Sequence, residues 1–189
     1  MALSHLLAAD EHELAEHYPN RAEHAADGAV HAIGIIGALV GGGLLVAAAL
    51  INRGVPLATA SAIYAMCLMA MLAASAVYNL TRPNRHRRIL RRIDEAAIFL
   101  MIAGSYTPFT IQLLPPSFAV GVTAAIWIAA LAGAAGKVLW QRLSVRAWSV
   151  IYLAFGLLAV VVLGPAVPTL PPLAIWLLGS RLSSIRAAC

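Results

Sequence analysis

A dense group of arginines between two apolar segments constrains this chain more than any other feature. Both flanking segments are long enough to form helices. The group comprises Arg82, Arg85, Arg87, Arg88, Arg91 and Arg92. So many charges in a short stretch cannot enter the hydrocarbon of a bilayer, so they fix the side of the membrane on which this part of the chain lies. They therefore fix the topology of everything that precedes and follows them.

The composition predicts a membrane protein. Of the 189 residues, 61% are hydrophobic and 11% are charged, and the mean hydropathy is +0.84. Soluble domains contain about 25% charged residues. The net charge of +5 comes mostly from loops, which points to membrane orientation and anionic headgroups rather than to nucleic acid. The expected partner is the lipid bilayer, and the sequence leaves the oligomeric state open.

Five apolar segments are each close to the ~20 residues that cross a bilayer as a helix. They are residues 29–51, 56–80, 95–114, 117–139 and 147–166. A sixth apolar segment, 170–179, is too short to cross alone. We therefore expect an all-α polytopic membrane helix bundle with five clear spans and a short or incomplete sixth. Gly37 and Gly41, four residues apart in the first span, are spaced for close helix approach.

The rest of the chain divides around these spans. Residues 1–20 are predicted to form an amphipathic cytoplasmic segment, 21–180 the transmembrane domain, and 181–189 a polar tail. The start of the chain has no cationic region of the kind that opens a signal peptide. Basic residues concentrate at 81–92 and 137–146, whereas the opposite loops contain only Arg53. The positive-inside rule then predicts a cytoplasmic N-terminus and a location in the cell (inner) membrane.

Polar residues inside the spans gather at the cytoplasmic ends of three helices. Asp27 and His31 belong to the first span, Ser75 and Asn79 to the second, and Asp94 to the third. Both pairs have i,i+4 spacing, which places each pair on one helix face. Ionisable groups are costly in a bilayer and usually line a cavity or pair with each other. We expect these residues to share a polar pocket near the inner surface.

Simpler interpretations exist for each of these residues taken alone. Asp27, Asp94 and the adjacent Glu95 are also placed where acidic side chains complement a helix N-terminus. A serine inside a span, such as Ser75, commonly bonds back to its own helix. It is the convergence of these residues from three helices that favours a functional site.

Several motifs resemble those of one known family. They are Glu23-His-Ala-Ala-Asp27-Gly-Ala-Val-His31-Ala-Ile-Gly34, Ser75-Ala-Val-Tyr78-Asn79, Asp94 and Ala103-Gly104-Ser-Tyr106-Thr107-Pro108-Phe109. Their order over residues 20–165 is similar to that of the hemolysin III branch of the progestin and adipoQ receptor (PAQR) superfamily. The last string is the most specific of the four.

The resemblance implies a fold and a chemistry. It implies seven spans, a cytoplasmic N-terminus, and a zinc site in the inner leaflet that hydrolyses lipid amides such as ceramides. By the same resemblance, Ser75 supports the site and Asp94 holds a zinc-bound water. The metal lowers the pKa of such a water to about 7.

The chain departs from the family pattern at the metal ligands. The family's span-two histidine is Asn79 here, and the histidine pair of span seven has no counterpart, so the chain is expected to be truncated before that span. We therefore expect a degenerate metal site in a protein that is non-catalytic or acts in membrane homeostasis. One alternative is a zinc-dependent, ceramidase-like hydrolase with a lipid substrate and a site rebuilt from Asp27, His31, Asn79 and Asp94. The other is a channel-forming cytolysin.

Overall fold

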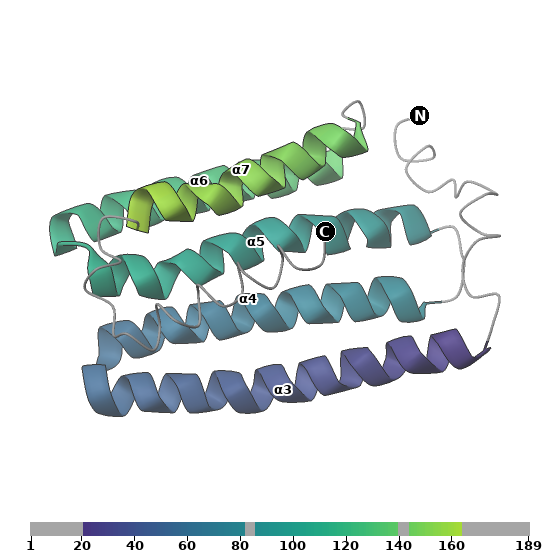
Figure 1. The fold of residues 1–189 in the computed structure, drawn as a ribbon, viewed down its shortest axis with the longest axis horizontal. Helices are drawn as coiled ribbons and strands as arrows, with labels where there is room; N and C mark the ends of the chain where they lie inside the picture. Colours follow the sequence, from purple (N-terminus) through teal and green to yellow (C-terminus); the bar gives the residue numbers. More distant parts are fainter. Residues whose placement is uncertain (1–20, 82–85, 140–143, 164–189) are drawn as a thin grey trace, which may run out of the picture.

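The computed structural model describes residues 21–81, 86–139 and 144–163, which form five α helices and, within these ranges, no strand. The helices are α3 (Arg21–Arg53), α4 (Val55–Leu80), α5 (Arg87–Leu113), α6 (Pro116–Leu139) and α7 (Val145–Leu163). Each runs antiparallel to the one before it (Figure 1). The predicted all-α membrane bundle is confirmed.

Four of these helices, α3 to α6, are long and apolar enough to cross a membrane. The fifth predicted span is present as α7, in which the apolar segment Arg146–Leu158 is shorter. The number of clear spans in the described residues is therefore four plus one short helix, rather than five. The predicted sixth segment at 170–179, the amphipathic segment at 1–20 and the polar tail at 181–189 lie outside the described ranges.

Two helices extend beyond their apolar spans toward the N-terminal side. The apolar span at 29–51 lies within a helix that occupies Arg21–Arg53, and the span expected at 95–114 belongs to a helix that begins at Arg87. Their 33 and 27 residues correspond to about 50 and 40 Å, whereas the hydrocarbon core is about 30 Å thick. The hydropathy pattern locates only the part of each helix that lies in the hydrocarbon core. Four arginines of the basic group therefore belong to a helix rather than to a loop.

Helix α5 is the centre of the bundle. It packs against α4 on one side and against α6 and α7 on the other, while α3 packs against α4 (Figure 1). The core joins α5, α6 and α7 through Phe99, Ala103, Tyr106, Ile126, Ala130 and Trp148. The Tyr106 hydroxyl donates to the Phe155 carbonyl at 2.9 Å. Apolar packing and a side-chain hydrogen bond together dock the short helix α7.

Small residues set the closest helix contacts. A Cβ added at Gly104 of α5 would lie 2.7 Å from the Cys67 Cβ of α4. One added at Gly42 of α3 would lie 2.9 Å from the Ala65 Cβ. By contrast, the predicted contact pair Gly37 and Gly41 has no described atom within 4 Å of such a Cβ. That prediction was wrong because spacing alone does not say which side of a helix faces its neighbour.

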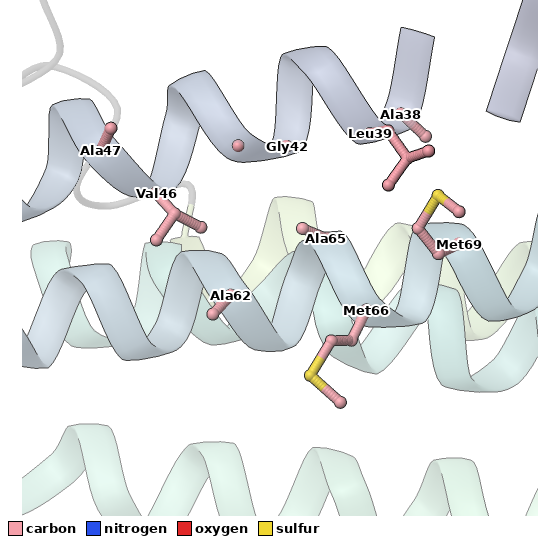
Figure 2. A pocket seen from close by; sticks show the side chains of 10 residues that line it. Ala38, Leu39, Gly42, Val46, Ala47, Ala62, Ala65, Met66 and Met69 are labelled. Atoms are coloured by element: carbon pink, nitrogen blue, oxygen red, sulfur yellow. The ribbon is translucent and has the colours of Figure 1, made fainter. Parts of the chain in front are cut away.

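An apolar groove of about 630 Å³ separates parts of α3 and α4. Figure 2 shows Leu39 and Met69 on its walls and Ala65 turned toward Gly42. The walls are almost wholly apolar, and Met66 at the rim is 71% exposed. This groove is an apolar, lipid-compatible face of the bundle that carries no chemistry of its own.

Candidate functional site

Side chains from three helices meet at the Ser75 hydroxyl. The Ser75 Oγ of α4 lies 3.3 Å from the His31 Nε2 of α3. It also accepts a hydrogen bond from the Asn79 Nδ2 one turn along α4, at 3.2 Å. The Asp94 carboxyl group of α5 lies close enough to interact with the same hydroxyl. We call His31, Ser75, Asn79 and Asp94 the Ser75 cluster; its side chains are all partly buried.

Backbone contacts fix the orientation of two members. The His31 Nδ1 lies 2.8 Å from the Asp27 carbonyl oxygen. A carbonyl can only accept, so Nδ1 carries a proton and Nε2 is the nitrogen turned toward Ser75. The Asn79 amide also donates to the Ser75 carbonyl of its own helix, at 3.0 Å. Asp27, predicted as a metal ligand, thus contributes its backbone carbonyl to the cluster.

The Ser75 hydroxyl is the polar group that these side chains share. It has a single proton, so it can donate to only one acceptor at a time. The His31 Nε2 is an acceptor within reach, and the Asp94 carboxyl group lies near both Ser75 and His31. The arrangement is therefore a compact polar cluster built from three helices.

Glu95 does not join this cluster, although it was grouped with Asp94 in the sequence. Its carboxylate accepts from the Arg91 Nε at 3.0 Å and also pairs with Lys137 of α6. The Tyr152 hydroxyl of α7 donates to the Glu95 carbonyl at 2.8 Å. Adjacent helical residues point about 100° apart, so Asp94 faces α4 and Glu95 faces α6. Glu95 serves to hold the basic ends of α5, α6 and α7 together.

The helix-dipole interpretation does not apply to Asp94 and Glu95. Both lie in the third turn of α5, since the helix begins at Arg87. Dipole effects fall off within the first turn. Asp27 is likewise six residues after the start of α3 as described. The polar contacts, rather than helix ends, account for the two carboxylates of α5.

The described donor set does not by itself fit a zinc ion. No three His, Cys, Asp or Glu side chains converge on a metal-sized space among the residues for which positions are given. His31 uses one nitrogen on a carbonyl, and Asn79 turns its NH₂ group to Ser75. Zinc sites normally take at least three protein ligands of these types. Zinc binding through Asp27, His31, Asn79 and Asp94 stays a prediction.

Two features near the cluster were not predicted. Lys137, the only lysine in the sequence, lies 4.9 Å over the Trp148 ring besides pairing with Glu95. Arg87 is buried, with its guanidinium 4.7 Å over the Tyr78 ring. Both residues belong to basic stretches that the sequence presents as solvated loops. Nothing in their spacing distinguishes a buried cation from an exposed one.

Comparison with known proteins agrees with the motifs. A family model described as haemolysin-III related matches residues 21–187. The chain is 28% identical over 98 residues to the hemolysin-3 homolog of Bacillus subtilis (strain 168), covering 52% of this chain and 46% of the relative. It is 25% identical over 143 residues to hemolysin-3 of Bacillus cereus, covering 76% and 65%. The chain thus spans between about half and two thirds of these relatives. No solved structure matches it.

Proposed function

The chain belongs to the haemolysin-III-related family, and on that premise we propose that it is a multi-pass membrane protein whose Ser75 cluster works without a bound metal. In this proposal the cluster is a hydrogen-bonded polar site at the inner leaflet, and the protein acts in membrane homeostasis rather than as a hydrolase. The lipid bilayer is its partner. Placement in the PAQR superfamily, with the inner membrane as its location, forms part of the same proposal.

One observation carries the proposal. At the position where the resemblance implies a histidine ligand, the Asn79 NH₂ group donates to Ser75 Oγ and to the Ser75 carbonyl. An amide group held in this way offers its donor side to the cluster, and an amide oxygen is a weak zinc ligand beside imidazole. The Ser75 hydroxyl and the Asn79 NH₂ group therefore have protein partners without a metal.

The charge distribution supports a cytoplasmic position for the cluster. The N-terminal end of α5 carries Arg87, Arg88, Arg91 and Arg92, and Lys137 closes α6 at the same end of the bundle (Figure 1). The opposite end carries Arg53. The positive-inside rule then favours a cytoplasmic basic end. In a chain whose Cys67 and Cys189 are replaced by serine, labelling of Ser144→Cys by an impermeant maleimide only from the cytoplasmic side would agree. Labelling only from outside would reverse the assignment.

A zinc-dependent lipid amide hydrolase is the second candidate, because His31 and Ser75 are in contact and Asp94 lies close to both. In such an enzyme His31 and Asp94 would be ligands or proton carriers, and a lipid amide would be the substrate. The channel-forming alternative has no comparable observation in its favour. The charges of α5 gather in its first turns rather than along the span.

Hydrolysis of a fluorescent ceramide in mixed micelles separates the two candidates. We expect the purified chain with added zinc to show no turnover above an Asp94→Ala variant, with a known ceramidase as the positive control. The physical reason is that the described residues place fewer than three zinc ligands at the cluster. Turnover that is lost in both Asp94→Ala and His31→Ala would establish the hydrolase instead.

A further inference from the structure

The first residue of α5 is a buried cation that lacks a counter-ion. Arg87 is only 2% exposed. Its Nη1 donates to the Thr81 carbonyl at 3.2 Å, and its guanidinium lies over the Tyr78 ring. Its Nη2 has no hydrogen-bond partner. Within the ranges 21–81, 86–139 and 144–163, Arg87 forms no salt bridge with a carboxylate.

An unpaired buried charge is an expensive arrangement, so it points to a missing partner. A neutral carbonyl and a ring face orient the guanidinium but supply no negative charge. The planar guanidinium presents parallel N–H groups that match the oxygens of phosphate or carboxylate. In Arg87 the Nη1 donates to a carbonyl, whereas the Nη2 has no acceptor. The missing partner is therefore an anion with oxygen acceptors.

The start of α5 gives a second, independent reason to expect an anion. This helix of 27 residues has no side-chain cap from His86 and no acidic residue in its first turn. Its first residues are instead Arg87 and Arg88. Helix N-termini expose backbone N–H groups and carry partial positive charge, so cations there are disfavoured and anions are favoured. The N-terminus of α5 and the Arg87 side chain therefore both favour binding of an anion.

The position of the site relative to the bilayer indicates which anion is available to bind there. Helix α5 is about 40 Å long, roughly 10 Å more than the hydrocarbon core. All the charged residues of the helix lie at or before Glu95, so the excess length is at the arginine end, among the headgroups. Phosphodiester groups are the abundant anions at that level, and basic clusters favour headgroups with net negative charge.

We propose that Arg87 and the N-terminus of α5 bind the phosphate group of an anionic phospholipid. The Thr81 carbonyl and the Tyr78 ring orient the guanidinium. A rotation of the side chain that brings the enclosed Nη2 outward lets it donate, together with the first N–H groups of α5, to the phosphate oxygens. The lipid would then link the end of α4 to the start of α5. This site is separate from the Ser75 cluster and does not depend on the absence of zinc there.

Thermal unfolding of the purified full-length chain in neutral detergent micelles tests the proposal. Added phosphatidylglycerol should raise the unfolding midpoint in a saturable way, because a ligand that binds only the folded state stabilises it. Phosphatidylcholine at the same mole fraction, and sodium phosphate at the same phosphorus concentration, should not. In Arg87→Gln the apparent affinity for phosphatidylglycerol should fall about tenfold. Arg146→Gln makes the same charge change at an exposed residue of the basic end and should leave that affinity unchanged.

Three results would overturn the proposal. One is an unchanged lipid affinity in Arg87→Gln, and another is an equal effect of phosphatidylcholine. The third is an equal effect of sodium phosphate, which would assign the site to a free anion. If Arg87→Gln does not fold, Arg87→Lys replaces it, since it keeps the charge but loses the planar fork. Its affinity should be about threefold weaker, and an affinity equal to that of the unmodified chain would again count against the proposal.

Discussion

At the scale of residues, one hydroxyl group joins three helices. Ser75 contacts His31 of α3, Asn79 of its own helix donates to it, and Asp94 of α5 lies close by. Each partner would otherwise be a polar group with reduced access to water. Polar side chains inside a membrane bundle are retained when they pair with each other. The cluster therefore helps to hold α3, α4 and α5 together, in addition to any functional role of the site.

Removing this hydroxyl should destabilise the protein more than removing a similar one elsewhere. We expect Ser75→Ala to lower the free energy of unfolding by about 1–3 kcal/mol, because it leaves several partly buried polar groups without their shared partner. Ser105→Ala is the matched control, since the Ser105 Oγ donates only to the Ile102 carbonyl of its own helix. Its effect should stay within about 0.5 kcal/mol.

Unfolding of the two serine variants in mixed micelles, followed by far-UV circular dichroism, provides the comparison. Equal losses for Ser75→Ala and Ser105→Ala would mean that the Ser75 contacts between helices contribute nothing to stability. The interpretation of the cluster as a satisfied network would then be wrong.

The positions of these side chains could be predicted only in part from the sequence, and their roles stay predictions. The i,i+4 spacing places Ser75 and Asn79 on one face, and topology brings His31 and Asp94 to the same end, so their meeting could be expected. The separation of Glu95 from Asp94 follows from helix geometry only once the neighbours of α5 are known. The burial of Arg87 could not be predicted, because hydropathy scores an arginine alike whether or not a ring and a carbonyl surround it.

At the scale of elements, α5 holds the bundle together. It is the most buried of the long helices, and it contacts α6 through polar as well as apolar groups. The Trp127 Nε1 of α6 donates to the Thr107 Oγ1 at 3.1 Å, and the Thr110 and Thr123 hydroxyls lie 2.6 Å apart. Such contacts between helices supply specificity in a bundle where the lipid is as apolar as the side chains.

Contact between α4 and α5 depends on Gly104. We expect Gly104→Ala to lower the free energy of unfolding by about 1–3 kcal/mol, the usual cost of overpacking, because the new Cβ would meet Cys67 at 2.7 Å. Gly37→Ala is the matched control on α3, where no described atom lies within 4 Å. It should be neutral, or stabilising by up to about 1 kcal/mol through helix propensity.

Denaturation of the two glycine variants by the same spectroscopic assay decides this point. If Gly104→Ala is as stable as Gly37→Ala, then α4 and α5 are not in contact at this position.

The helix boundaries show a limit of sequence-based prediction. Hydropathy finds the segment in hydrocarbon, whereas hydrogen bonding continues the first turns of α5 through Arg87, Arg88, Arg91 and Arg92.

At the scale of the whole molecule, the chain folds as a serial bundle with a strongly basic end. Antiparallel neighbours bring the start of α3, the end of α4 and the start of α5 to that end (Figure 1). The Ser75 cluster and the buried Arg87 both lie there, at the ends of α4 and α5. The polar site and the cation that we propose binds lipid therefore share one end of the bundle.

The zinc content of the purified chain tests the central claim, that the Ser75 cluster holds together without a metal, most directly. After purification in the presence of zinc and removal of loosely bound metal, elemental analysis should find far less than one zinc per chain. Asn79→Asp, which adds a carboxylate at the same position, provides a variant in which binding is favoured by ligand chemistry. One zinc per unmodified chain, lost in both His31→Ala and Asp94→Ala, would contradict the account and establish a metal centre.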